Sequence, residues 1–159
     1  MKHLFIMFFV FFLFSCKNED KATVGSIYPE EAAAIAKHGE IRLLDEAELQ
    51  KSWEKRLEGM KLTAFEVIKG KTEGENGEDY YMVLARTEDG IKVAALLEMR
   101  GDKFYFDASG QKDSESYLLV VCKGECDQGC LPAVKLAEGA KRIICSSCAD
   151  CSKNEVEVF

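Results

Sequence analysis

Six cysteines near the C-terminal end carry the most specific chemical signal in this 159-residue sequence. They form two triplets with the spacings C-x3-C-x3-C and C-x2-C-x2-C, separated by fourteen residues. The first triplet is Cys122, Cys126 and Cys130, and the second is Cys145, Cys148 and Cys151. Thiols at such spacings can oxidise to disulfides, hold a metal as thiolates, or act as a redox pair.

Disulfides are the chemistry that we expect from these cysteines. Residues 122–159 are rich in Gly, Ser and Asp and contain few large apolar side chains, so bridges would compensate for a small core. We expect the bridges to join the first triplet to the second, because a bridge within C-x2-C is typical of reactive redox pairs. Each bridge would add about 2–4 kcal/mol by restricting the unfolded chain.

Three other chemistries fit parts of the cysteine pattern. Two cysteine pairs can hold zinc in a tetrahedron of thiolates, which makes zinc the alternative cofactor. Cys145 and Cys148, in the sequence C-S-S-C, would be the first residues to suspect in a thiol redox protein. The second triplet also resembles the first three iron–sulfur ligands of bacterial ferredoxins, but no cysteine follows in residues 152–155 to continue that pattern.

The first fifteen residues predict export. Lys2 and His3 precede eleven apolar residues, 4–14. This run is shorter than the roughly 20 residues of a spanning helix and matches the roughly 7–15 of a secretory signal core. The run ends in Leu13-Phe14-Ser15-Cys16, which resembles the lipobox of bacterial lipoproteins.

The resemblance implies a membrane anchor at Cys16. In that family the leader is cut before the cysteine, which carries a thioether-linked diacylglycerol and an acylated amine. Several acyl chains together hold a protein on a bilayer where one would not. Lys17 and the acidic residues after it are similar to surface-export signals, so we expect the outer membrane and its outward-facing leaflet.

Charge and histidine content exclude several functions. Removing the leader would leave 20 basic and 28 acidic residues, a net charge of −8, which argues against nucleic-acid binding. The only histidine outside the leader is His38, which we expect to cap a helix before Gly39, so no histidine-based catalytic set is evident. We therefore expect a protein that is not an enzyme and whose partner is an envelope protein or an extracellular ligand.

Two helices are expected at the N-terminal end of the folded part. Alanine-rich residues 26–38 predict the first helix, with Gly39 after its end. Residues 45–59 predict the second, because Asp45 and Glu48 fit a capping box. In that helix Trp53 has the helical spacing of a core anchor.

Alternating apolar residues and glycine turns predict strands over residues 62–71, 80–87, 91–100, 103–107 and 117–122. The strand over 80–87 is apolar on both faces, and we infer that the helices cover one of them. The expected fold class is α+β, with two N-terminal helices packed on an antiparallel β-meander of about five strands and an irregular cysteine-rich C-terminal tail.

Four regions follow from these patterns. They are a signal peptide over residues 1–15, a lipidated flexible tether over 16–25, an α+β domain over 26–121 and a cysteine-rich segment over 122–159. The expected function is that of a lipid-anchored cell-envelope protein, a binding or structural module stapled by disulfides. The alternative is a thiol redox or zinc-type metal-handling protein that uses the C-terminal cysteines.

Overall fold

The computed structural model describes residues 30–74, 77–109, 115–126, 129–146 and 148–159. The expected leader, Cys16 and the tether lie outside these residues. Within the described part, no helix has the length and apolar content that crossing a membrane would require.

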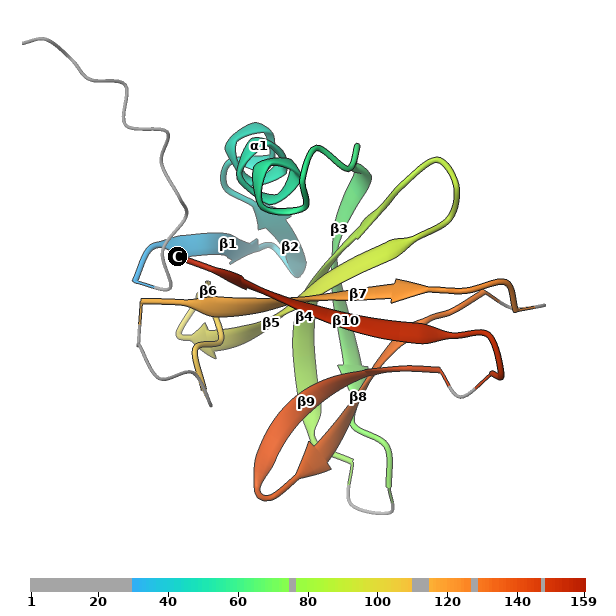
Figure 1. Ribbon diagram of the computed structural model, residues 1–159. Helices are drawn as coiled ribbons and strands as arrows, with labels where there is room; N and C mark the ends of the chain where they lie inside the picture. The colour runs from blue at the N-terminus through green and yellow to red at the C-terminus, as the bar shows by residue number, and fades with distance from the viewer. Residues whose placement is uncertain (1–29, 75–76, 110–114, 127–128, 147) are drawn as a thin grey trace, which may run out of the picture.

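The described residues contain one helix and ten strands (Figure 1). In chain order they are β1 (Ala32–Lys37), β2 (Glu40–Leu43), α1 (Glu46–Arg56), β3 (Thr63–Lys71), β4 (Asp79–Arg86), β5 (Lys92–Arg100), β6 (Lys103–Phe106), β7 (Tyr117–Lys123), β8 (Pro132–Ala137), β9 (Ala140–Cys145) and β10 (Ser152–Val158).

Strand β5 organises the main sheet, in which all pairs are antiparallel. One side of β5 pairs with β4, which in turn pairs with β3. The other side is shared, because residues 92–94 pair with β7 and residues 97–100 pair with β6. The sheet therefore divides into two wings, β7–β10 and β6–β1–β2. Strand β2 at the end of its wing contacts β3, so this side of the sheet is nearly closed (Figure 1).

Helix α1 packs its apolar face against one face of this nearly closed sheet. Asp45 caps the helix, because its Oδ1 accepts a hydrogen bond from the Glu48 backbone N–H at 2.9 Å. Leu49 and Trp53 are buried, and the Trp53 Nε1–H donates to the Tyr117 hydroxyl at 3.0 Å. Phe106 stacks on the Tyr117 ring with centroids 4.0 Å apart. The second expected helix and the role of Trp53 as a core anchor are confirmed.

The prediction of a first helix over residues 26–38 is wrong. Residues 32–37 form β1, which pairs with β2 on one side and with β6 on the other. His38 and Gly39 make the two-residue turn between β1 and β2, with φ of 53° and 84°, as type I′ hairpins require. His38 therefore sits in a hairpin turn and caps no helix. The helix propensity of alanine is a weak preference, and pairing on both edges of β1 outweighs it.

The prediction of an irregular cysteine-rich tail over residues 122–159 is also wrong. Residues 132–145 form the β8–β9 hairpin, and β10 pairs with β7 along its whole length. The strands expected between residues 62 and 122 are present as β3 to β7. The α+β class with two helices on a meander is nevertheless contradicted, because the described fold is mostly β with one short helix.

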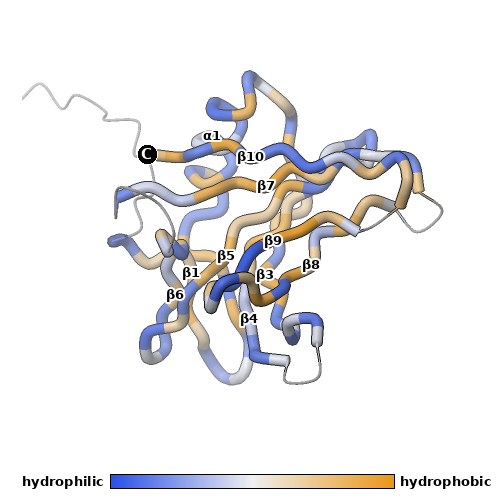
Figure 2. The backbone as a smooth tube through the Cα atoms, turned by 60° about the horizontal axis from the view of Figure 1, so that its bottom comes forward, coloured by the Kyte–Doolittle hydropathy of each residue, from blue (hydrophilic) through white to orange (hydrophobic). Residues whose placement is uncertain are grey.

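The main sheet is covered on both faces. Val83, Ala85 and their neighbours on one face join a helix-side cluster with Trp53. Met82 and Leu84 on the other face join a hairpin-side cluster. The remaining buried members of the hairpin-side cluster are Ala94, Val120, Cys122, Cys130, Val134 and Ile143. Figure 1 shows α1 and the β8–β9 hairpin on opposite sides of β7 and β10, and Figure 2 shows apolar residues along β5 and β7. The second apolar face of β4, for which the sequence indicated no cover, is therefore covered by the β8–β9 hairpin.

Removing the Tyr117 hydroxyl should destabilise the protein. Tyr117→Phe leaves the buried Trp53 N–H without its acceptor, so we expect the free energy of unfolding to fall by about 1–3 kcal/mol in urea titrations. Tyr105→Phe, at a half-buried position on β6, is the matched control and should change stability by less than about 0.5 kcal/mol. Equal losses in the two variants would contradict the role of this hydrogen bond.

Glu54 on α1 should contribute stability that is lost in acid. Its carboxylate accepts hydrogen bonds from the Lys61 Nζ at 2.9 Å, the Leu62 backbone N–H at 3.0 Å and the Gln50 Nε2 at 3.0 Å. These contacts lower the pKa of Glu54 from 4.5 to about 2. Because the folded-state pKa is depressed, this stability is fully present above pH 4.5 and is lost as the pH falls toward 2.

Glu54→Gln should therefore flatten the loss of stability over that pH range, as measured by urea unfolding at several pH values. Glu88→Gln, at an exposed turn position, is the control and should keep the wild-type slope. A Glu54→Gln variant with the wild-type slope would show that this carboxylate has no part in acid unfolding.

Candidate functional site

Three disulfides join the two cysteine triplets in chain order. They are Cys122–Cys145, Cys126–Cys148 and Cys130–Cys151, with Cα–Cα distances of 5.6, 6.3 and 5.3 Å. The expectation that bridges link the first triplet to the second is confirmed. Cys145 and Cys148 are not bonded to each other, so the structure contains no bridge within C-S-S-C.

The ends of three strands bring Cys122, Cys145 and Cys151 together. Cys122 is near the end of β7, and Cys145 ends β9. Cys151 directly precedes β10, and Ser152 at the start of β10 pairs with Lys123 of β7. The pairing of β10 with β7 therefore carries the second triplet back to the first.

Gly124 allows the two cysteine segments to approach closely. A Cβ at this position would lie 2.3 Å from the Asp150 carbonyl oxygen and 2.7 Å from the Cys151 Cα. Both atoms belong to the backbone and cannot turn away, so only glycine fits at this distance.

The bridges fasten the β8–β9 hairpin to the main sheet. The hairpin contributes only Val134 and Ile143 to the fully buried members of the hairpin-side cluster. The hairpin also makes polar contacts with the sheet, such as the 2.7 Å hydrogen bond from the Lys141 Nζ to the Asp79 carbonyl. The bridges close segments of 23, 22 and 21 residues, and each should contribute about 3 kcal/mol by the chain-entropy estimate.

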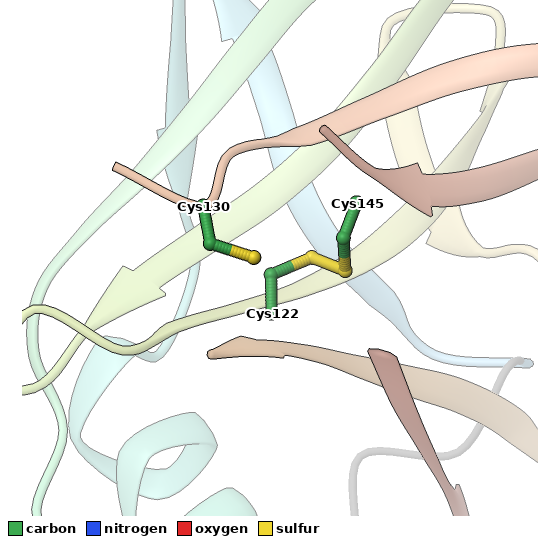
Figure 3. Close-up of side chains that lie close together, drawn as sticks. All are labelled: Cys122, Cys130 and Cys145. Carbon is green, nitrogen blue, oxygen red and sulfur yellow. A yellow bond between two sulfur atoms is a disulfide. The ribbon is translucent and has the colours of Figure 1, made fainter. Parts of the chain in front are cut away.

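The six sulfur atoms form two groups. In the inner group, the Sγ atoms of Cys122, Cys130 and Cys145 all lie within 4.8 Å of one another (Figure 3). The outer group of Cys126, Cys148 and Cys151 has the same property. Each group holds one complete bridge and one sulfur of the Cys130–Cys151 bridge, which links the groups. Zinc would need thiolates, so either group could bind it only after its bridges were reduced.

The two groups differ in exposure. Cys122 and Cys130 of the inner group are buried, at 0% and 2% exposure, and Cys145 is half-buried. The three outer cysteines are all half-buried. Solvent therefore has better access to the outer group.

Polar residues that the sequence analysis did not single out lie next to both groups. Lys92 of β5 and Lys153 of β10 stand directly opposite Cys122 in the register, and directly opposed residues share a face of the sheet. The Ser146 Oγ lies 3.9 Å from the Cys151 Sγ. Ser146 directly follows Cys145, so its position within the second cysteine triplet could have indicated that it lies near the cysteines.

A hollow beside the β8–β9 hairpin and another on the flank of α1 differ from an enclosed ligand pocket. The hollow beside the hairpin holds about 30 Å³ and is lined both by apolar residues such as Leu96 and Leu118 and by charged ones such as Arg142. Pockets for small molecules are typically about 300–1,000 Å³. The second hollow, about 380 Å³ on the flank of α1, is open to solvent and lined mainly by charged side chains. The cysteine cluster is therefore the strongest candidate site in the described part of the chain.

Comparison of the chain with family models, with curated proteins and with solved structures finds no match in any of the three. The functional argument therefore rests on the residues themselves.

Gly124→Ala should interfere with bridge formation. The added Cβ must push the backbone at Asp150 and Cys151 away, which should cost about 1–3 kcal/mol and leave free thiols in part of the protein produced in an oxidising compartment. Counting alkylated thiols by intact mass without reduction measures this directly.

Gly139→Ala is the matched control, because its Cβ would meet nothing within 4 Å, although its φ of +78° carries a backbone penalty. We expect the control to keep all three bridges. Complete bridging in Gly124→Ala as well would show that the close approach at Gly124 is not needed.

Proposed function

We propose that this chain is a lipid-anchored cell-envelope protein that acts as a binding or structural module, stapled by three disulfides and without catalytic activity. The observation that carries the proposal is the pairing of all six C-terminal cysteines across the two triplets. Disulfides of this density persist in oxidising compartments such as the bacterial envelope. The lipobox-like sequence that ends at Cys16 supplies a route to that compartment.

The bridges support this proposal because they act where the fold is weakest. A two-stranded hairpin is marginally stable alone, and the β8–β9 hairpin buries few apolar side chains. Leu136 of β8 and Leu131, the residue before β8, are each 41% exposed. A hairpin fixed by covalent bonds presents those residues in one conformation, which lowers the entropy lost when a partner binds. The partner class that we propose is an envelope protein or an extracellular ligand.

A second candidate is a thiol redox or zinc-handling protein, and one observation favours it. In each sulfur group a third Sγ lies within 4.8 Å of a disulfide, which is closer than independent structural bridges require. After reduction, each group would offer three thiolates, and zinc could complete its four-coordinate shell with a water or another ligand. Zinc bound in stoichiometric amount to exported protein would favour this candidate over the first.

The anchor is tested by producing the full chain in a Gram-negative bacterial host and separating the membranes by density. We expect the protein in the outer-membrane fraction, with Cys16 as the first residue and a mass increased by a diacylglycerol and an acyl chain. Cys16→Ala is the control and should leave the leader uncut or the protein out of the lipid-anchored fraction. An unmodified Cys16 in a cleaved, soluble wild-type protein would refute the lipoprotein proposal.

A further inference from the structure

We propose that the three disulfides form a relay for thiol–disulfide exchange, along which a free thiol passes between the outer and inner sulfur groups. The proposal rests on the arrangement of the bridges and not on the lipid anchor, so the two can fail separately. It goes beyond a structural staple, in which each bridge needs only its own two cysteines.

The sulfur atoms provide a continuous path. Exchange requires a thiolate to reach a sulfur of a disulfide, and within each group every Sγ lies within 4.8 Å of the others. The Cys130–Cys151 bridge has one sulfur in each group. Figure 3 shows the Cys130 side chain directed toward the Cys122–Cys145 bridge. A thiolate formed in either group is therefore next to a bridge that it can attack.

The first step of the relay starts from a thiolate in the outer group. The Cys126 thiolate attacks the Sγ of Cys151 and forms a Cys126–Cys151 bond. The Cys130–Cys151 bond breaks, and its electron pair leaves with Cys130 as a thiolate.

The second step takes place in the inner group. The Cys130 thiolate attacks one sulfur of the Cys122–Cys145 bridge, forms a new bond with that cysteine, and releases the other as a thiolate. Each step consumes one thiolate and one disulfide and regenerates one of each. No oxidant or reductant is needed after the first thiolate appears.

Because the outer sulfur group is more exposed than the inner one, we expect exchange to start in the outer group and to proceed inward. A dithiol, either a small molecule or a partner protein, can reach both half-buried cysteines of the Cys126–Cys148 bridge, whereas in the inner bridge Cys122 is buried and only Cys145 is half-buried. One sulfur of the dithiol bonds to one of the two outer cysteines, and the other leaves as the starting thiolate. The relay then opens the inner bridge without direct contact between the dithiol and the protein interior.

Neighbouring polar groups favour the thiolates that the relay needs. Lys92 stands directly opposite Cys122 in the register of β5 and β7, and its amine donates a hydrogen bond to the neutral Gly90 carbonyl at 3.2 Å. Lys153, also opposite Cys122, pairs with Glu155 at 2.7 Å and contributes less. A nearby cation stabilises a thiolate over a thiol. In the outer group the Ser146 hydroxyl, 3.9 Å from the Cys151 Sγ, can donate a hydrogen bond to a thiolate at Cys151.

The test places a single free thiol at one end of the relay. Cys148→Ala in the full chain, exported and purified in detergent, leaves Cys126 without its partner. After incubation at mildly alkaline pH, acid stops the exchange, the denatured protein is labelled with a reagent that reacts with thiols in acid, and peptide mass spectrometry locates the label. We expect more than about a tenth of the molecules to carry it on Cys130, Cys122 or Cys145.

The matched control removes the middle bridge. Cys148→Ala combined with Cys130→Ala and Cys151→Ala interrupts the path, so the label should remain on Cys126. Label confined to Cys126 in the single variant would overturn the relay. The same spread of label in the control would also overturn it, because exchange would then proceed through unfolding.

A second variant starts from the other end and serves if Cys148→Ala does not fold. Cys145→Ala leaves Cys122 free in the inner group, and the relay should move the thiol outward to Cys126, Cys148 or Cys151. Label found only on Cys122 would overturn the proposal. Any label on Cys16 reports a missing lipid and is read separately from the relay, because Cys16 lies on a different peptide.

Discussion

Burial of both faces of the central strands is the constraint on which the rest of the structure depends. Strand β4 alternates Val83 and Ala85 toward α1 with Met82 and Leu84 toward the hairpin. Both faces must be covered, and the two covers differ in strength. Helix α1 brings Trp53 and Leu49 and needs no covalent support, whereas the β8–β9 hairpin brings little apolar surface. The three disulfides stabilise the weaker cover, which explains why all six cysteines lie at that side of the sheet.

The parts of the fold that the sequence predicts are those with local signals. Asp45 and the apolar spacing through Trp53 define α1, and glycine turns separate β4, β5 and β6. The failures have a common cause in long-range pairing. An alanine-rich segment became β1 because two neighbouring strands pair with it, and β10, with its charged alternation, pairs with β7 far along the chain. Local propensity contains no information on such partners.

The candidate site was predictable in kind but not in arrangement. The cysteine spacing indicated disulfides between the two triplets, and each disulfide in the structure joins one cysteine of the first triplet to one of the second. The chain order of the pairs depends on β10 returning beside β7. The contact between Cys130 and the Cys122–Cys145 bridge, with the three Sγ atoms within 4.8 Å of one another, has no signal in the spacing of the cysteines. The same contact connects the two proposed roles, because bridges packed this tightly both fix the hairpin and place each thiolate beside a disulfide.

Disulfide mapping of the full chain, produced in an oxidising compartment, tests the central claim most directly. The protein is alkylated without reduction and digested, and the linked peptides are identified by mass spectrometry. The account predicts three linked pairs, Cys122 with Cys145, Cys126 with Cys148, and Cys130 with Cys151, and no alkylated cysteine among these six. A bridge between Cys145 and Cys148, or six free thiols holding a metal, would contradict it.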